Sequence, residues 1–280
     1  MPGLKIAVMV SNLKMDPYEG FRVVAEMGVP GVHLSVGSGP FAPDALDASG
    51  RKALLDHLKG MDLEISAVSA WGGNVDLCER EGLAGHVEHA KAILDLAVDL
   101  GCGIWQAHIG IMPHETSHPR WDTLVESAGE IARHGEQVGA CLAIETGPEP
   151  PRVVQRLIET VGSEAIRVNY DPGNLIIWPA LLAAREGRTY DKEAAMEAFE
   201  PTEGVKRLGP YTVHTHAKDA VVGEDGIRQE VPLGTGWVEW DRYVSLLDEQ
   251  GYSGYVAIER ETGEDPVGDI RRAVNFLKTL

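Results

Sequence analysis

Four side chains that commonly bind metal ions stand at regular intervals in the second half of the chain. They are Glu145, Asp171, His216 and Glu259. Each stands at or near the end of a short apolar run, and the gaps between them are 26, 45 and 43 residues, long enough for a strand, a helix and their connections. Three carboxylates and one imidazole form an oxygen-rich donor set, which suits one divalent ion: Mn²⁺ first, then Mg²⁺, Co²⁺ or Zn²⁺. The alternative for any one of these acids is a structural role, as a helix cap or an arginine partner.

The apolar runs that carry these residues belong to a series of eight expected strands. Most are apolar along their length, as in parallel strands buried on both faces. They span residues 4–10, 31–36, 63–69, 103–109, 141–146, 166–171, 211–216 and 255–260. Helical periodicity marks residues 17–27, 44–59, 83–100, 121–138, 152–161, 193–208, 240–250 and 266–280.

This alternation predicts an α/β protein, a (β/α)8 TIM barrel formed as a single domain over residues 1–280. In such a barrel the functional residues come from the carboxyl ends of the strands, so the four side chains should lie side by side around half of the mouth. The longest expected connections, at 110–120, 172–191 and 217–238, would form the rim of a pocket. An open doubly wound sheet is the alternative, but its GxGxxG motif does not follow the first strand.

Charge and cysteine content restrict the partners and the compartment. The 280 residues carry 25 Lys and Arg against 43 Asp and Glu, a net charge of −18, with no basic run longer than two residues, which argues against a nucleic-acid partner. The three cysteines are far apart and odd in number, so no disulfide framework is expected. No apolar stretch approaches the roughly 18 residues that a membrane helix needs, and no leader pattern opens the chain. A cytoplasmic protein without membrane contact is expected.

Five motifs occur in order from about residue 140 onward. They are IE at 144–145, DPGN at 171–174, HAKD at 216–219, GTG at 234–236 followed by Trp240, and GYVAIE at 254–259. In this order and spacing they resemble the xylose isomerase-like TIM barrels. That superfamily contains sugar isomerases and epimerases, lyases of the inosose dehydratase type and DNA repair enzymes of the endonuclease IV type.

The resemblance implies that Glu145, Asp171, His216 and Glu259 ligate one divalent metal, and that the two glutamates are the catalytic acid–base pair, as in the ketose 3-epimerases. Because family members often assemble as dimers or tetramers, it also implies that this chain could form a homo-oligomer. One departure matters: many relatives have a histidine three residues after the aspartate, where this chain has Asn174. An amide cannot carry a proton at neutral pH, which argues against a second metal or a histidine-dependent step there.

The leading hypothesis is a metal-dependent sugar isomerase or epimerase that abstracts a proton α to a carbonyl through a metal-stabilised enediolate. We expect an unphosphorylated sugar or keto-sugar, because no Arg/Lys cluster or glycine-rich turn marks a phosphate site. The alternative is a lyase or dehydratase that uses the same site for β-elimination on a keto-polyol or 3-keto-glycoside. Two less favoured hypotheses are an endonuclease-IV-like phosphodiesterase and a non-catalytic binding protein. Ser69 and Asn174 disfavour the phosphodiesterase because they replace expected histidines.

Four further residues are candidates for substrate binding. His108 ends the fourth expected strand, Asn174 and Lys218 follow two of the ligands, and Arg228 lies in the long segment before the GTG motif. Each has a structural alternative: a hydrogen-bonded core side chain for His108, and a solvent-exposed loop side chain for Arg228.

Overall fold

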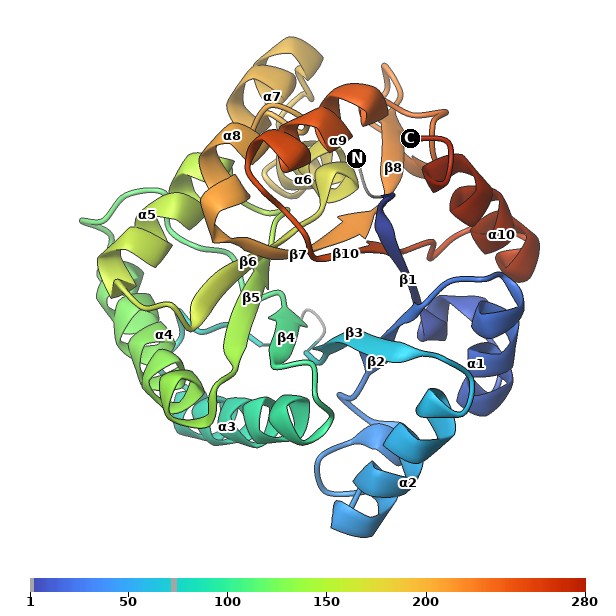
Figure 1. Cartoon of the computed structure of the whole chain (residues 1–280). Coiled ribbons are helices and arrows are strands. Elements are labelled where there is room, and N and C mark those ends of the chain that lie inside the picture. The colour runs from blue at the N-terminus through green and yellow to red at the C-terminus, as the bar shows by residue number, and fades with distance from the viewer. Residues whose placement is uncertain (1–2, 72–74) are drawn as a thin grey trace.

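The structure is a computed structural model that describes residues 3–71 and 75–280. Eight parallel strands close into a barrel in the order β1, β10, β7, β6, β5, β4, β3, β2. Figure 1 shows these strands as a central ring with the helices outside, and the colour runs once around it until β10 meets β1. The strands are β1 (Lys5–Met9), β2 (Gly31–Ser35), β3 (Glu64–Ser69), β4 (Ile104–Ala107), β5 (Cys141–Glu145), β6 (Ile166–Tyr170), β7 (Thr212–Ala217) and β10 (Tyr255–Ile258). The predicted (β/α)8 barrel is confirmed.

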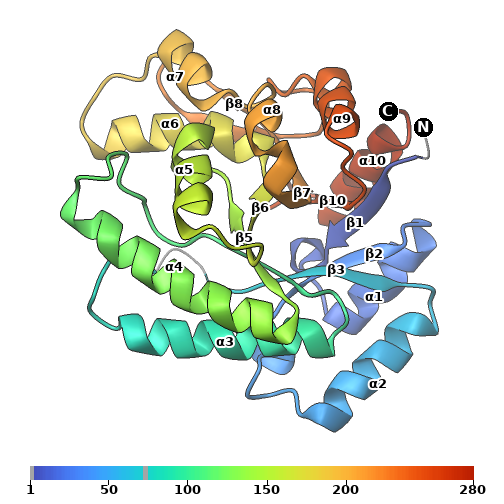
Figure 2. The same ribbon diagram turned by 60° about the vertical axis from the view of Figure 1, so that its left-hand side comes forward.

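Most of the helices begin where a side chain or a proline stabilises the first turn. Asp16, Asp47 and Asp265 accept backbone N–H groups at three of these starts, and a proline opens several helices. The helices are α1 (Pro17–Glu26), α2 (Ala48–Lys59), α3 (Leu83–Asp99), α4 (Pro119–Val138), α5 (Pro151–Val161), α6 (Pro172–Arg185), α7 (Lys192–Phe199), α8 (Val205–Leu208), α9 (Trp240–Glu249) and α10 (Pro266–Leu277), with 3-10 turns η1 (Val10–Leu13), η2 (Gly39–Phe41) and η3 (Gly209–Tyr211). Figure 2 shows α3 and α4 lying side by side on the outside of the barrel. Among the described residues, no helix combines the length and apolar character needed to cross a bilayer.

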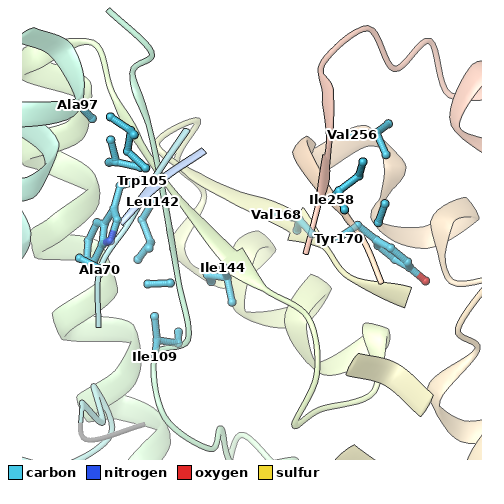
Figure 3. Packing of buried hydrophobic residues seen from close by; sticks show 14 of the residues in the cluster. Ala70, Ala97, Trp105, Ile109, Leu142, Ile144, Val168, Tyr170, Val256 and Ile258 are labelled. Carbon is cyan, nitrogen blue, oxygen red and sulfur yellow. The ribbon is translucent and has the colours of Figure 1, made fainter. Parts of the chain in front are cut away.

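Apolar side chains fill the layer between the strands and the helices. Figure 3 shows part of this core, with Trp105 and Leu142 on β4 and β5 and with side chains from β6 and β10. Because successive side chains of a strand point to opposite faces, the residue after each core-facing position points to the barrel axis. Ile144, Tyr170 and Ile258 are such core positions, and each directly precedes a predicted metal ligand. The strand period therefore aims these ligands inward.

The connection expected at residues 172–191 is wrong, because α6 occupies most of it. Asp171 accepts the backbone N–H of Asn174 and Pro172 opens the helix, so a strand end passes directly into a helix. The helix expected at 193–208 is in fact two. α7 ends at Phe199, Glu200 takes a left-handed conformation with φ of 45°, and α8 resumes at Val205.

The connection expected at 217–238 contains a two-stranded antiparallel hairpin, β8 (Asp219–Val222) and β9 (Arg228–Val231). Asp219 anchors it: its carboxylate accepts the backbone N–H groups of Gly234, Gly236 and Val238 and the indole N–H of Trp240. The HAKD and GTG motifs are thus two halves of one hydrogen-bonded structure. Asp219 directly follows Lys218, so this structure also holds the backbone at the barrel mouth.

Candidate metal centre

The barrel brings together the four side chains that the sequence singles out as metal ligands. Glu145 ends β5, Asp171 follows β6, His216 lies on β7 and Glu259 follows β10, on strands that are consecutive around the barrel. Nδ1 of His216 lies 2.7 Å from Oε2 of Glu259, 3.0 Å from Oε1 of Glu145 and 3.7 Å from Oδ2 of Asp171. All four side chains are buried, and one ligand atom from each lies within 4.8 Å of the others.

The donor set fits a single divalent cation. Donors that share one small ion at about 2.1–2.2 Å stand roughly 3 Å apart. The distances from His216 Nδ1 to the two glutamates match this spacing. Within the described part of the chain, Oδ2 of Asp171 is buried and accepts no hydrogen bond, and Nζ of Lys218 is 3.5 Å away from it. Buried carboxylate oxygens are costly unless a donor or a cation satisfies them, so this atom points to a metal ion.

Glu145 is held from several directions. Its Oε1 accepts the amide N–H of Asn174 at 3.0 Å, and its Oε2 lies 3.2 Å from Nε2 of His108 and also accepts from Gln106. Burial raises the pKa of Glu145, but His108, and then His216, outweigh burial, so the pKa falls below its ordinary value. The carboxyl is therefore ionised, oriented and ready to bind a cation. Gln106, which shares a strand face with His108, adds a contact that spacing alone does not identify.

Asp171 has two separate tasks. Its Oδ1 accepts the backbone N–H of Asn174 at 2.9 Å and caps α6, which leaves Oδ2 facing the cluster. Its backbone N–H donates to Oγ1 of Thr146 at 2.7 Å, which ties the end of β6 to the end of β5. The helix-cap role and the ligand position are compatible here because each uses a different carboxylate oxygen.

Lys218 is a buried cation beside the ligands. Its Nζ lies 3.0 Å from Oε2 of Glu259, 3.5 Å from Oδ2 of Asp171 and 3.4 Å from Oε2 of Glu261. Burial raises the pKa of Glu259, but Lys218, and then His216, reverse this and hold that pKa well below its usual range. Burial raises the pKa of Asp171 to about 6, although Lys218 opposes the rise. A positive charge thus compensates part of the carboxylate charge.

His33 on β2 is a site residue that the sequence interpretation missed. Its Nδ1 lies 3.3 Å from Nε2 of His216, and His214 packs edge-on against both rings. Burial, and then the charge of His216, lower the pKa of His33 far below its ordinary value. Burial also disfavours charge on His216, but Glu259 and Glu145 overcome it and raise the pKa of His216 well above the ordinary value. The available signal was a single imidazole in the middle of an apolar strand.

The four predicted substrate-binding residues divide into two groups. His108, Asn174 and Lys218 all lie within hydrogen-bond or ion-pair distance of a ligand carboxylate. Arg228 is exposed at the start of β9, next to the hairpin turn, and its side chain forms no hydrogen bond or ion pair with the described residues. The structure does not bring Arg228 to the cluster.

Two cavities lie near the mouth. One of about 220 Å³ is lined by Ser35, Ser69 and Trp71 and their neighbours at the carboxyl ends of β2 and β3. A larger one of about 440 Å³ lies between α6, α7 and the segments after β4 and β5, and none of the four ligands lines it. The smaller cavity is on the rim opposite the ligands.

Comparison with known proteins places this geometry in a family. Residues 21–280 match the family model described as xylose isomerase-like TIM barrel. The structure is similar to that of a xylose isomerase domain protein from Planctomyces limnophilus, with a TM-score of 0.80 and 26% identity over 99% of this chain and 96% of that one. It has the same fold as a xylose isomerase-like TIM barrel protein from Mycobacterium smegmatis in complex with magnesium, with a TM-score of 0.73 and 20% identity over 99% and 96% of the two chains.

A curated relative is L-ribulose-5-phosphate 3-epimerase UlaE of Escherichia coli, which is 34% identical over 70 residues. That match covers 24% of each protein, so the chain spans about a quarter of the length of the curated relatives it matches. The family includes sugar epimerases and isomerases. With the family model matching nearly the whole barrel, the chain belongs to the xylose isomerase-like TIM barrel family.

Proposed function

We propose that the protein is a divalent-metal-dependent sugar isomerase or epimerase that removes a proton from the carbon next to a carbonyl. The observation that carries this proposal is the buried ring of three carboxylates and one imidazole at the barrel mouth. Glu145, Asp171, His216 and Glu259 would hold the ion, with Mn²⁺ the first candidate for this mixed oxygen and nitrogen set. When bound, such a cation supplies a Lewis acid that stabilises negative charge developing on neighbouring carbonyl and hydroxyl oxygens.

Glu145 and Glu259 are proposed as the acid–base pair. They lie on β5 and after β10, with β6 and β7 between them, so they flank the ligand set from two sides. If one carboxylate removes a proton and the other returns one to the opposite face, the outcome is epimerisation. If one carboxylate removes the proton and returns it to the neighbouring carbon, the outcome is isomerisation. The low pKa of Glu259 keeps its carboxylate ionised, which both cation binding and proton abstraction require.

His108 is proposed to orient Glu145 and to contact the substrate. Its Nε2 lies 3.2 Å from Oε2 of Glu145, and about a quarter of its side chain is exposed at the mouth. The ring of Trp178 lies 5.9 Å from the His108 ring. An imidazole that touches both a reacting carboxylate and solvent can hold a substrate hydroxyl while it fixes the direction of the carboxylate.

The rim opposite the ligands supports an uncharged polyol as the substrate. Oγ of Ser35 lies 3.1 Å from Oγ of Ser11 and 3.4 Å from Oγ of Ser69, next to the ring of Trp71 in the cavity wall. Hydroxyl groups that both donate and accept suit sugar hydroxyls. Lys218 already pairs with carboxylates, so its charge is not free for a phosphate. We therefore propose an unphosphorylated sugar or keto-sugar, unlike the phosphorylated substrate named for the Escherichia coli relative.

Deuterium exchange tests this function directly. The metal-free protein, with and without Mn²⁺, would be incubated with ketoses and keto-sugars in D₂O and followed by NMR. We expect metal-dependent deuterium incorporation at the carbon next to the carbonyl. Glu259→Gln should slow it at least about 100-fold, the lower end of what a general base contributes. Glu264→Gln is the matched control on the same segment, because Glu264 is exposed and outside the cluster, and should keep the wild-type rate.

The products of the same assay separate the related reactions. Inversion of one stereocentre identifies an epimerase, and movement of the carbonyl identifies an isomerase. An enone that absorbs in the ultraviolet would instead identify a lyase. No exchange into any substrate, despite bound metal, would refute the proposed chemistry. Elemental analysis should find one metal ion per chain, whereas three zinc ions would favour a phosphodiesterase.

A further inference from the structure

His33 and His216 come from opposite parts of the barrel, 183 residues apart, and meet through one nitrogen each. The contact joins His33 Nδ1 and His216 Nε2 at 3.3 Å, and both residues are completely buried. The ring centroids lie 5.2 Å apart at an interplanar angle of 43°. His214 lies against both rings at 5.0 and 5.7 Å, nearly perpendicular to each, and is itself hydrogen-bonded to Asn169 at 2.8 Å. The surrounding core therefore holds His33 in place.

Which ring donates in this hydrogen bond follows from the surroundings of Nδ1, the other ring nitrogen of His216. Nδ1 of His216 faces acceptor-only oxygens, those of Glu145 and Glu259. If Nδ1 offers its lone pair to a cation, the remaining ring proton must be on Nε2. With the cation bound, Nε2–H therefore donates and Nδ1 of His33, 3.3 Å away, accepts.

We infer that His33 is a positioning residue, whose Nδ1 accepts the Nε2–H of His216 and so keeps Nδ1 of His216 directed at the cation. This inference rests on the proposed metal site. Metal-binding histidines generally donate their second N–H to an acceptor that fixes the ring and its tautomer. Here that acceptor is another imidazole, on a strand that contributes no ligand. The role does not require His33 to touch the substrate or the ion.

The other nitrogen of His33 argues against a purely structural role. With Nδ1 as acceptor, the proton of neutral His33 is on Nε2. Within the described residues, this buried Nε2 has no hydrogen-bond partner. An unpartnered buried donor costs stability, so an apolar side chain would serve the core as well or better. A histidine at this position is explained by the bond that it accepts from His216.

Two substitutions separate positioning from packing. In His33→Asn, the side-chain oxygen can stand near the position of Nδ1 and accept the same bond, whereas His33→Leu fills similar space without an acceptor. Mn²⁺ dissociation constants would be measured by electron paramagnetic resonance on metal-free protein, without substrate. We expect His33→Leu to bind Mn²⁺ 10- to 100-fold more weakly, the usual effect of losing such a partner, and His33→Asn to stay within about threefold of the wild type. The unfolding temperature of the metal-free Leu variant should equal or exceed that of the wild type.

Spectroscopy of the Co²⁺-loaded proteins gives a second readout. The Nε2 proton of His216 should produce a shifted, slowly exchanging ¹H resonance in the wild type and in His33→Asn. In His33→Leu that resonance should broaden or vanish through exchange with water. Equal Mn²⁺ affinity in the wild type and the Leu variant would overturn the inference, as would equal losses in both variants. A wild type that binds metal without turning over any sugar would refute the proposed reaction and leave the role of His33 intact, whereas a wild type that binds no divalent ion would refute both.

Discussion

Replacing Glu149 by glutamine should remove a loss of stability that the wild type suffers at alkaline pH. Glu149 lies between β5 and α5, is 1% exposed, and accepts the backbone N–H of Met112 at 2.6 Å. Burial raises its pKa from 4.5 to about 8, and the charge of Asp76 adds to the effect. Glutamine has nearly the same shape and keeps an oxygen for the N–H of Met112, but it cannot ionise.

The sign and size of the effect follow from linkage between protonation and folding. The folded chain holds the Glu149 proton more tightly than the unfolded chain, so its contribution is complete below pH 4.5 and is lost as the pH rises to about 8. Each pH unit in this window costs ~1.4 kcal/mol, so the loss is about 3 kcal/mol between pH 6 and 8 and about 5 kcal/mol over the whole window. For a chain of this size, 3 kcal/mol corresponds to a change of roughly 5 °C in Tm.

Calorimetry of metal-free protein from pH 5 to 9 measures this difference. Wild type and Glu149→Gln should have similar Tm values near pH 5, and the variant should become several degrees more stable above pH 8. Other titrating groups cancel in the comparison because both proteins contain them. Glu115→Gln, in the exposed segment before α4, is the control and should follow the wild type at every pH. Parallel curves for wild type and Glu149→Gln would refute the assignment of a protonated, buried carboxyl.

Three further predictions concern the metal site, the hairpin and the cysteines. Mn²⁺ at 100 times its Kd should stabilise the wild type by about 2.7 kcal/mol in denaturant titrations, and Asp171→Asn, which keeps an oxygen to cap α6, should lose most of this gain. Asp219→Ala should lower the free energy of unfolding by about 2–4 kcal/mol because several buried donors lose their acceptor. Gly236→Ala should also be destabilising, because its Cβ would stand 2.1 Å from Oδ1 of Asp219. Additive losses in the double variant would contradict the idea that both residues belong to one hydrogen-bonded structure. Burial raises the thiol pKa to about 11 at Cys102 and about 12 at Cys141. Iodoacetamide at pH 7.5 should therefore label both thiols slowly in the native protein and quickly after unfolding. Rapid labelling of the native protein would contradict this burial.

The barrel could be predicted from the sequence because its signals are local. Apolar strands such as Cys141–Glu145 alternate with amphipathic helices such as Pro151–Val161, and both periods are visible within a few residues. The prediction failed where one residue serves two purposes. The sequence pattern predicts that Asp171 ends a strand before a long connection, yet in the structure it also caps α6. The pattern therefore gives no separate sign that a helix begins at the next residue.

The common location of the four expected ligands could be predicted from the sequence because strand ends of a parallel barrel share one face, whatever the details of packing. Their partners could not be predicted in the same way. Glu145 contacts Gln106 and His108, but which oxygen each of them meets depends on the rotation of the side chains inside the mouth. The position of Arg228 could not be predicted either, because a basic residue in a long segment has no defined direction until the hairpin places it.

Because period and residue type act over short distances, one can predict from the chain the order of strands and helices and the strand ends that carry Glu145, Asp171, His216 and Glu259. The orientation of the His216 ring, with Nδ1 toward the carboxylates and Nε2 toward His33, arises only in the folded barrel. That orientation depends on closure of the barrel, which brings His33 of β2 to one edge of the His216 ring and Glu145 and Glu259 to the other edge. No local pattern encodes a contact between residues 183 positions apart, because it exists only after every strand between them has taken its place.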